Sequence, residues 1–367
     1  MTFDDYRGGS TRRVGGDPRA DSFGSTNVTR RAFLKLSALA AVPLLLPKAP
    51  VAAYLDRDAL LSDPPPASLG RIATWWRQAI REEPSEGAKA LAWKSRDDLV
   101  PLYASVTGEA PWPTNPVWYQ TEGGYIHSGY VQPVENQSQG VISEVAPPGF
   151  WAQVSVPWAE ARTSPASAYV LHKLYYGTVY RVVAVVSDDG GNAWYQLKEG
   201  VSPWRSGPYV LASTLRPIPP EALAPISQGH PDKWIQIDLA AQRLTCLEGD
   251  VAVFSTSISS GHRATATPRG EFRVLYKRHA RRMTMSGIAD PYDLPGVPFV
   301  VYFTWRGVAI HGTYWHNDYG RVHSHGCVNA TPDAAQWIYR WVDPVAPYEA
   351  YTTDADPAEA GTRIVVV

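Results

Sequence analysis

The alternation of apolar and polar residues in the C-terminal part of the chain predicts antiparallel β-strands and one short helix. Residues 233–239 largely alternate between apolar and polar, as a half-buried strand does, and a turn then leads to a second strand that carries Cys246. Apolar runs on either side of a glycine-containing turn predict a hairpin over 298–311, which leaves His311 at a strand end. Thr331, followed by a proline and an acidic residue, is typical of a helix N-terminus, so a helix is expected there.

Upstream of this part the pattern predicts a helix and then a β-rich region. Apolar residues between 68 and 93 recur at helical spacing, which predicts a helix inside a linker over 54–96. Short β-like runs follow over 97–220, where an aromatic strand, a turn, a second strand and a proline occur in that order at 118–134 and again at 194–218. We therefore expect two small β modules. Their aromatic residues either form an exposed binding surface or fill two cores, and we favour the cores for most of them.

Composition and charge narrow the possible functions. The formal net charge of 367 residues is -1, so bulk electrostatic attraction to nucleic acid is not expected. With only two cysteines the chain cannot be a disulfide scaffold. Cys246 shares a strand face with Leu244 and is expected to be a small buried apolar residue, although one disulfide between Cys246 and Cys327 is a possible alternative. The sequence specifies no oligomeric state.

The first 53 residues have the character of an export leader. The pair Arg30-Arg31 precedes an apolar run over 36–46 that is too short to span a bilayer comfortably as a permanent helix. This arrangement resembles a twin-arginine signal, and the small residues at 51–53 offer a cleavage site. We expect the twin-arginine export machinery as a partner and a location outside the cytoplasmic membrane, either in the cell wall or tethered by an uncleaved signal. An ordinary amphipathic N-terminal helix is the alternative.

Candidate chemistry is concentrated between residues 311 and 329. A cysteine with a nearby imidazole is the minimum equipment for nucleophilic acyl transfer, because the imidazole can take the thiol proton or, as imidazolium, stabilise the thiolate. His311 lies at a strand end upstream of Cys327, and His325 lies two residues before it, on the same side of an extended segment. His316 is an alternative to His311. A zinc site on His323, His325 and Cys327 is a second alternative.

The block Ser324-His325-Gly326-Cys327-Val328-Asn329, together with His311-Gly312, resembles the signature of the L,D-transpeptidases, the YkuD-like enzymes that cross-link peptidoglycan. The resemblance extends over 228–367. It implies a mainly β protein, with an antiparallel β-sandwich-like catalytic domain in that range. The region 97–220 loosely resembles a pair of SH3-like barrels, which often accompany cell-wall enzymes. The gap between His311 and Ser324 is a little shorter than is common in the family.

The resemblance also implies roles for individual residues. Cys327 would be the nucleophile and His311 the general base and acid, with the His311 ring oriented by the backbone carbonyl of Gly312. Backbone N–H groups around Gly326 and Cys327 would bind the oxyanion. The remaining residues of the block would shape the turn or hold the substrate; these are Ser324, His325 and Asn329.

The activity implied is formation of 3→3 peptidoglycan cross-links through a cysteine thioester, in cell-wall biogenesis and the maintenance of cell shape. The partners would be a tetrapeptide donor stem and an acceptor amine, and no cofactor or metal is implied. Three further readings of the sequence stay open. With water as acceptor the protein would be an L,D-carboxypeptidase, with a zinc site it would be a metallopeptidase, and with an inert C-terminal domain it would be a non-catalytic wall-binding protein.

Overall fold

The structure is a computed structural model that describes residues 68–198, 207–286, 291–356 and 361–367. The chain divides into two units, Met1–Val51 and Ala52–Val367, and only the second contains described residues. The leader predicted over 1–53 and the first part of the linker, 54–67, therefore lie outside the described residues. In the described part the fold is mainly β, as expected, and its one α-helix is α2 (Pro332–Trp341). No helix there is long and apolar enough to cross a membrane.

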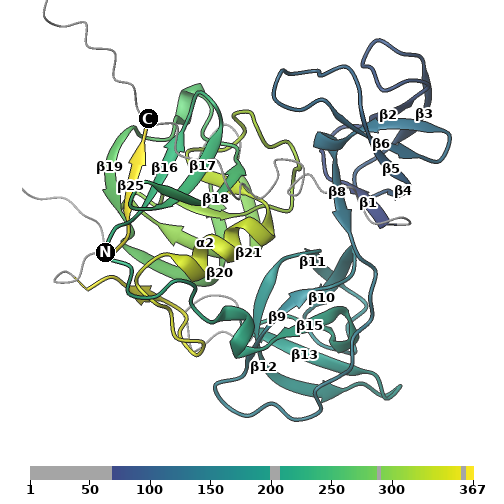
Figure 1. The fold of residues 1–367 in the computed structure, drawn as a ribbon. Helices are drawn as coiled ribbons and strands as arrows, with labels where there is room; N and C mark the ends of the chain where they lie inside the picture. The colour runs from purple at the N-terminus through teal and green to yellow at the C-terminus, as the bar shows by residue number, and fades with distance from the viewer. Residues whose placement is uncertain (1–67, 199–206, 287–290, 357–360) are drawn as a thin grey trace, which may run out of the picture. The chain divides into compact units, whose positions relative to one another are not determined.

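Residues 68–134 form a first β module (Figure 1). Its strands make a three-stranded sheet in the order β4-β1-β8 and a five-stranded sheet in the order β3-β2-β7-β6-β5. A small apolar core that includes Ile72, Tyr119 and Val131 lies between them. The elements are β1 (Ser68–Ile72), β2 (Gln78–Arg81), β3 (Ala90–Lys94), β4 (Leu99–Leu102), β5 (Ala104–Thr107), β6 (Val117–Thr121), β7 (Gly124–His127), the 3-10 turn η1 (Ser128–Tyr130) and β8 (Val131–Val134).

The helix predicted between 68 and 93 is wrong, and with it the module boundary at 97. Strands β1, β2 and β3 occupy that stretch, and β1 pairs antiparallel with both β4 and β8. The apolar residues share no helical face. Ile72 is buried at the end of β1, whereas Trp75 and Trp76 are 73% and 66% exposed in the turn that follows. Pairing with strands far along the chain overrides the local spacing here.

Residues 150–218 form a second β module around one seven-stranded sheet, in the order β11-β10-β14-β13-β12-β9-β15. Its elements are β9 (Phe150–Val154), β10 (Trp158–Arg162), β11 (Val170–Tyr175), β12 (Val179–Ser187), β13 (Ala193–Lys198), β14 (Tyr209–Leu211), the 3-10 turn η2 (Ala212–Thr214) and β15 (Leu215–Ile218).

The order of elements predicted to occur twice recurs in the structure. In each module an aromatic strand and its partner lead through a 3-10 turn to a last strand, and that last strand pairs with the first strand of the module. Most aromatic residues of the repeat fill the cores, as expected, since Trp118, Trp194 and Tyr195 are buried. The SH3-like character of the two modules stays a prediction.

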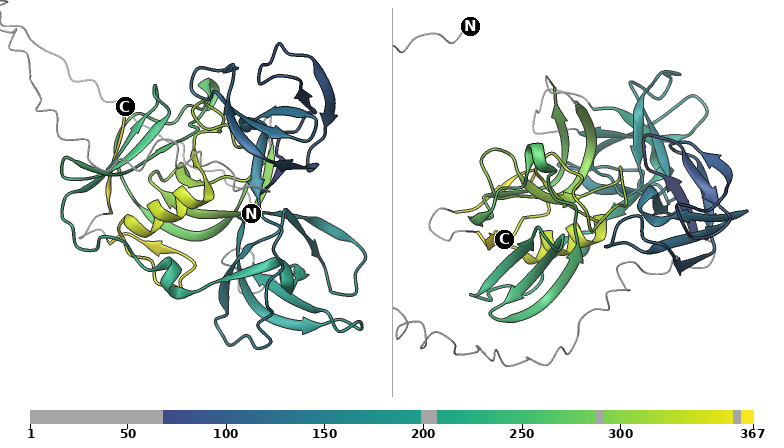
Figure 2. Two further views of the ribbon diagram at one scale, coloured as in Figure 1. Left: turned by 45° about the vertical axis from the view of Figure 1, so that its right-hand side comes forward. Right: turned by 90° about the horizontal axis from the view of Figure 1, so that it is seen from above.

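The described residues from 220 onward form the catalytic-domain candidate, which has two five-stranded sheets in the orders β18-β17-β16-β25-β19 and β23-β22-β21-β20-β24. Helix α2 packs against β21 and β22 (Figure 1 and Figure 2). A single large apolar core joins both sheets and the helix. The elements are η3 (Pro220–Leu223), β16 (Lys233–Asp238), β17 (Arg243–Glu248), β18 (Val251–Ser257), η4 (Arg263–Thr265), β19 (Gly270–Arg273), β20 (Tyr276–Met285), β21 (Tyr292–Tyr302), β22 (Ala309–Gly312), β23 (Val328–Ala330), α2, β24 (Thr353–Asp354) and β25 (Arg363–Val366).

The strands and the helix predicted in this domain are confirmed. Strand β16 pairs antiparallel with β17, and β21 with β22, which places His311 on the last but one position of β22. The Thr331 hydroxyl accepts a hydrogen bond from the Ala334 N–H at 3.2 Å, so it caps α2 as expected. Two pairings are parallel, β22 with β23 and β16 with β25, and these were not foreseen.

Candidate active site

The fold brings the two principal candidates onto neighbouring strands. His311 lies on β22, which pairs with β21 on one side and with β23 on the other. Cys327 immediately precedes β23, and the parallel register sets Asn329 of β23 opposite His311. Continued by one residue, the same register places Cys327 level with Ala309, two residues before His311 on β22. A thiol and an imidazole distant in sequence are thus held by one rigid sheet.

His311 is buried and has a defined tautomer when neutral. Its Nδ1 atom lies 3.0 Å from the carbonyl oxygen of Gly312, the contact expected from the sequence. Because a carbonyl oxygen can only accept, Nδ1 carries the proton and Nε2 carries the lone pair. Burial lowers the pKa of His311 to about 4. The ring is therefore neutral at physiological pH, with a nitrogen able to take a proton.

Cys327 is half-buried, and its Sγ atom lies 3.7 Å from the carbonyl oxygen of Gly307, in the turn between β21 and β22. Burial raises the pKa of the Cys327 thiol to about 11, although a backbone hydrogen bond at Ala309 acts in the opposite direction. The resting thiol is therefore protonated. These pKa values favour a neutral His311 that receives the thiol proton during the reaction over a preformed pair of Cys327 thiolate and His311 imidazolium.

The turn that presents Cys327 is fixed by side-chain hydrogen bonds. Ser324 Oγ donates to the carbonyl oxygen of Cys327 at 2.5 Å and accepts from the Gly326 N–H at 3.0 Å. Gly326 has a φ of 124°, a conformation that favours glycine. Its N–H was expected to bind the oxyanion but is engaged by Ser324. The N–H of Cys327, without a partner in the described part of the chain, is the remaining donor.

A second loop, which contains Gly261 and Thr267, also stabilises the turn that presents Cys327. Thr267 Oγ1 donates to the carbonyl oxygen of Gly326 at 2.8 Å and accepts from the Gly261 N–H at 2.9 Å. Nothing in the sequence indicates this role beyond a threonine in a glycine-flanked loop. His325 lies at the edge of the turn, with its ring 5.3 Å from that of His262 and 5.4 Å from that of Tyr292.

His316 is poorly suited to replace His311 as the base. It is buried, its Nδ1 accepts from the Asp318 N–H at 3.1 Å, and its Nε2 lies 2.9 Å from the amide of Asn329. In a neutral ring whose Nδ1 accepts, Nε2 carries the proton, so the Asn329 amide must present its oxygen to it. Both ring nitrogens are then occupied. Asn329, expected to hold the substrate, is itself buried and supports the strand beside His311.

Neither a disulfide nor a zinc site at the cysteines finds support. Both Cys246 and Cys327 are free thiols, and Cys246 is fully buried in the core, as expected. Within the described ranges, no three His, Cys, Asp or Glu side chains are grouped so that they could hold a metal ion. The zinc site considered for His323, His325 and Cys327 therefore lacks an assembled ligand set there.

A thiol and an imidazole on one sheet, with a backbone donor beside the thiol, are the groups that cysteine acyl transfer requires. Residues 232–366 match the family model of the YkuD domain, the L,D-transpeptidase catalytic domain. The C-terminal part of the chain is therefore similar to the catalytic domain of the L,D-transpeptidases. This match lies inside the range 228–367 over which the sequence resembles that family.

Individual relatives are similar over the same part. L,D-transpeptidase 1 of Mycobacterium tuberculosis is 29% identical over 108 residues, which are 28% of this chain and 43% of the relative. Probable L,D-transpeptidase 3 of the same organism is 32% identical over 92 residues, 23% of this chain and 34% of the relative. The chain thus spans less than half the length of these relatives.

Among solved structures, an Enterococcus faecium L,D-transpeptidase is 26% identical, with a TM-score of 0.31, and the match covers 37% of this chain and 50% of that one. An L,D-transpeptidase from Mycobacterium smegmatis is 20% identical, with a TM-score of 0.31, and the match covers 51% of this chain and 99% of that one. TM-scores this low carry no weight, and the assignment rests on the family match.

Proposed function

We propose that this protein is a peptidoglycan L,D-transpeptidase that forms 3→3 cross-links through a thioester on Cys327. The observation that supports this best is the state of His311. Its Nδ1 is committed to the Gly312 carbonyl at 3.0 Å, which leaves Nε2 as a base on the strand that pairs with the one following Cys327. An inert core cysteine would need neither a polar turn nor an oriented imidazole.

The first half-reaction transfers the donor stem to the enzyme. Cys327 Sγ attacks the carbonyl carbon of the third residue of a tetrapeptide stem, and the thiol proton passes to Nε2 of His311. The developing oxyanion accepts a hydrogen bond from the Cys327 N–H. When the intermediate collapses, the bond to the terminal D-alanine breaks, and His311 returns the proton to the leaving amine. The products are a thioester and free D-alanine.

The second half-reaction consumes the thioester. A side-chain amine of a neighbouring stem attacks the thioester carbonyl, gives its proton to His311 and displaces the sulfur, which is reprotonated by His311. The new amide is the cross-link. If water takes the place of the amine, the product is a shortened stem and the enzyme is an L,D-carboxypeptidase.

A neutral resting pair has a consequence for the first step. With the pKa of Cys327 near 11 and that of His311 near 4, the proton does not move before the substrate binds. We infer that transfer of the thiol proton to His311 accompanies attack on the peptide carbonyl.

The decisive test is covalent labelling followed by product analysis. One of the related solved LD transpeptidases is in complex with imipenem. Incubation of the full chain with imipenem should give one adduct, on the tryptic peptide with Cys327, and Cys327→Ser should give none. Purified tetrapeptide muropeptides should then yield cross-linked dimers and free D-alanine. A folded protein that forms neither adduct nor product would overturn the proposal, and shortened monomers alone would identify a carboxypeptidase.

We further propose that the protein acts outside the cytoplasmic membrane after twin-arginine export. The support is Arg30-Arg31 before the apolar run at 36–46. Fusion of residues 1–53 to a reporter that is exported only when folded tests this. Export should be lost on replacement of Arg30 and Arg31 by lysines, and export that persists would contradict it.

A further inference from the structure

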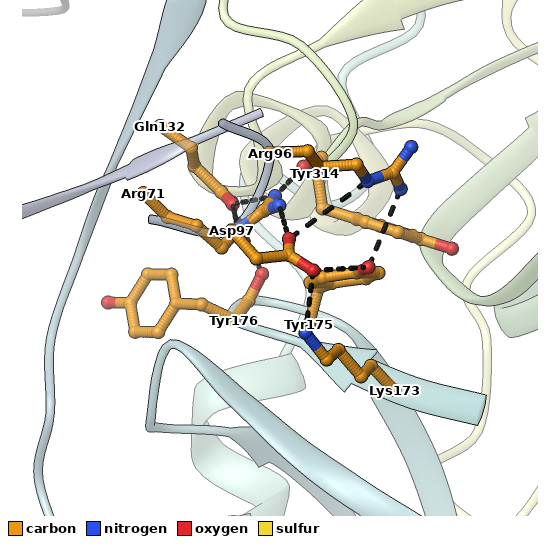
Figure 3. Close-up of polar contacts among 8 residues, drawn as sticks. All are labelled: Arg71, Arg96, Asp97, Gln132, Lys173, Tyr175, Tyr176 and Tyr314. Carbon is orange, nitrogen blue, oxygen red and sulfur yellow. Dashed lines mark hydrogen bonds and ion pairs between the residues drawn. The ribbon is translucent and has the colours of Figure 1, made fainter. Parts of the chain in front are cut away.

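The segment 313–323, which joins β22 to the turn of Cys327, is held from outside the catalytic domain. Arg71, on β1 of the first module, donates from Nη2 to the backbone carbonyl oxygen of Tyr314 at 2.5 Å (Figure 3). Tyr314 follows His311 by only three positions along the chain. Arg71 of the first module therefore binds the backbone close to His311, the candidate base.

The Arg71 guanidinium is held in one orientation. It is 0% exposed, and its Nη1 donates to Asp97 Oδ1 at 3.0 Å. Its Nε and Nη2 both reach Gln132 Oε1, at 3.3 and 2.7 Å, and its carbon lies 4.3 Å from the centre of the Tyr175 ring. Because Asp97 and Gln132 hold the planar guanidinium in one orientation, the second N–H of its Nη2 is directed at the Tyr314 carbonyl oxygen.

The second module completes this cluster, as Figure 3 shows. Lys173 Nζ lies 2.8 Å from Asp97 Oδ2, and the Tyr175 hydroxyl donates to the same oxygen at 3.3 Å. The Tyr175 ring also stacks on the Tyr314 ring, with centroids 5.5 Å apart. The partly buried Asp97 carboxylate thus binds Arg71 of the first module and is itself bound by side chains of the second.

The far end of segment 313–323 is held by the first module as well. The Asn317 N–H donates to the Gly129 carbonyl oxygen at 3.4 Å, and Asn317 Nδ2 donates to that of Ser128 at 3.2 Å. The guanidinium of Arg321 lies 4.6 Å from the centre of the Trp112 ring. These contacts come from the turn η1 and from the loop before β6, so two separate parts of the first module bind segment 313–323.

What the segment carries explains why its position matters. The Trp315 ring lies 5.8 Å from that of His311, and His316 contacts Asn329, the residue opposite His311 in the β22–β23 pairing. The segment therefore both covers the candidate base and supports the strand that follows the thiol. A small displacement of reacting groups costs large factors in rate.

We infer that the first module is a positioning element for the active site, and that Arg71 is the positioning residue through which it holds segment 313–323 over His311. The expected effect on catalysis rests on the proposed function, whereas the effect on the segment does not. If the Arg71–Asp97 ion pair served only to stabilise the fold, its loss would not change the hydrogen exchange of segment 313–323 in variants compared at equal stability.

Arg181 of the second module provides a matched control. It is also 0% exposed and donates to backbone carbonyls, those of Tyr348 at 3.0 Å and Pro148 at 3.2 Å. It therefore anchors the catalytic domain as Arg71 does, but at a segment that follows α2 and contains no candidate residue. We would make three variants in the full chain, Arg71→Met, Arg71→Lys and Arg181→Met. Each is measured at the same number of degrees below its own melting temperature.

The first measurement follows the segment itself, by hydrogen exchange and mass spectrometry. Peptides within 313–323 should exchange about tenfold faster in Arg71→Met and at the wild-type rate in Arg181→Met. Arg71→Lys, which keeps one donor for the Tyr314 carbonyl, should lie between. Wild-type exchange in Arg71→Met would overturn the inference, whether or not the protein is active.

The second measurement follows Cys327 acylation by imipenem against pH. Arg71→Met should lower the maximal rate by about tenfold. It should also move the acid limb from about pH 4 upward, because water would reach His311, which has His316 as a titratable neighbour. An unchanged rate and acid limb would contradict a positioning role. If the wild type is not acylated at all, the proposed function fails, and hydrogen exchange still decides the inference.

Discussion

The protonation state of the Cys327 thiol can be measured without a substrate. Burial raises its pKa from 9.0 to about 11. At pH 7 a thiol with a pKa of 9.0 is about 1% ionised, and one with a pKa near 11 about 0.01%, so alkylation should be about 100-fold slower in the folded protein than in the unfolded chain. The same shift corresponds to about 3 kcal/mol between the two protonation states. The rate should rise about tenfold per pH unit between pH 6 and pH 10.

The assay is alkylation with iodoacetamide at a series of pH values, followed by mass spectrometry of the peptide that contains Cys327. The slope against pH is decisive, because partial burial of the thiol lowers the rate equally at every pH. Cys246 is fully buried and should remain unlabelled, and the urea-unfolded chain gives the reference rate. A rate that is independent of pH between 5 and 8 would refute the reasoning, since it would require a standing thiolate paired with imidazolium.

The remaining predictions concern three further residues. Burial raises the pKa of Asp318 from 3.8 to about 7, so its stabilising contribution is present below pH 4 and is lost as the pH rises through 7. Asp318→Asn should therefore increase the free energy of urea unfolding at pH 8, by up to about 4 kcal/mol, but not at pH 4; an equal change at both would contradict this. Ser324→Ala leaves the Gly326 N–H and the Cys327 carbonyl without partners, and should cost about 1–3 kcal/mol in thermal unfolding and slow acylation by imipenem; unchanged acylation would rule out a role in shaping the turn. His311→Gln should reduce acylation by a factor of about 10²–10⁴ and leave the pH slope of alkylation unchanged; loss of both would indicate a structural role.

Local signals in the sequence were sufficient for the separate elements of the site, although not for the parallel pairing of β22 with β23. The cap of α2 depends on Thr331 and its immediate neighbours, and the hairpin that carries His311 depends on two apolar runs separated by a turn. Each is stabilised mainly by residues close in sequence, which is why the pattern identifies it. The contact between His311 and the Gly312 carbonyl also involves adjacent residues.

Features that depend on distant partners were missed. Strand β1 exists because β4 and β8 pair with it, and nothing between 68 and 93 encodes those partners. The cluster around Arg71 is a stronger example. Its contacts with Asp97, Gln132 and Tyr314 join residues from distant parts of the chain, and each is an ordinary polar or aromatic residue when taken alone.

The place of β25 has a consequence for biosynthesis. This strand lies between β16 and β19 and pairs with both, yet it is translated long after either of them. Until Arg363–Val366 has emerged from the ribosome, the nascent chain presents two unpaired edges where the finished sheet is continuous, and such edges are sites of pairing with other chains. Synthesis interrupted shortly before residue 363 should therefore yield an aggregation-prone fragment rather than a slightly shortened domain.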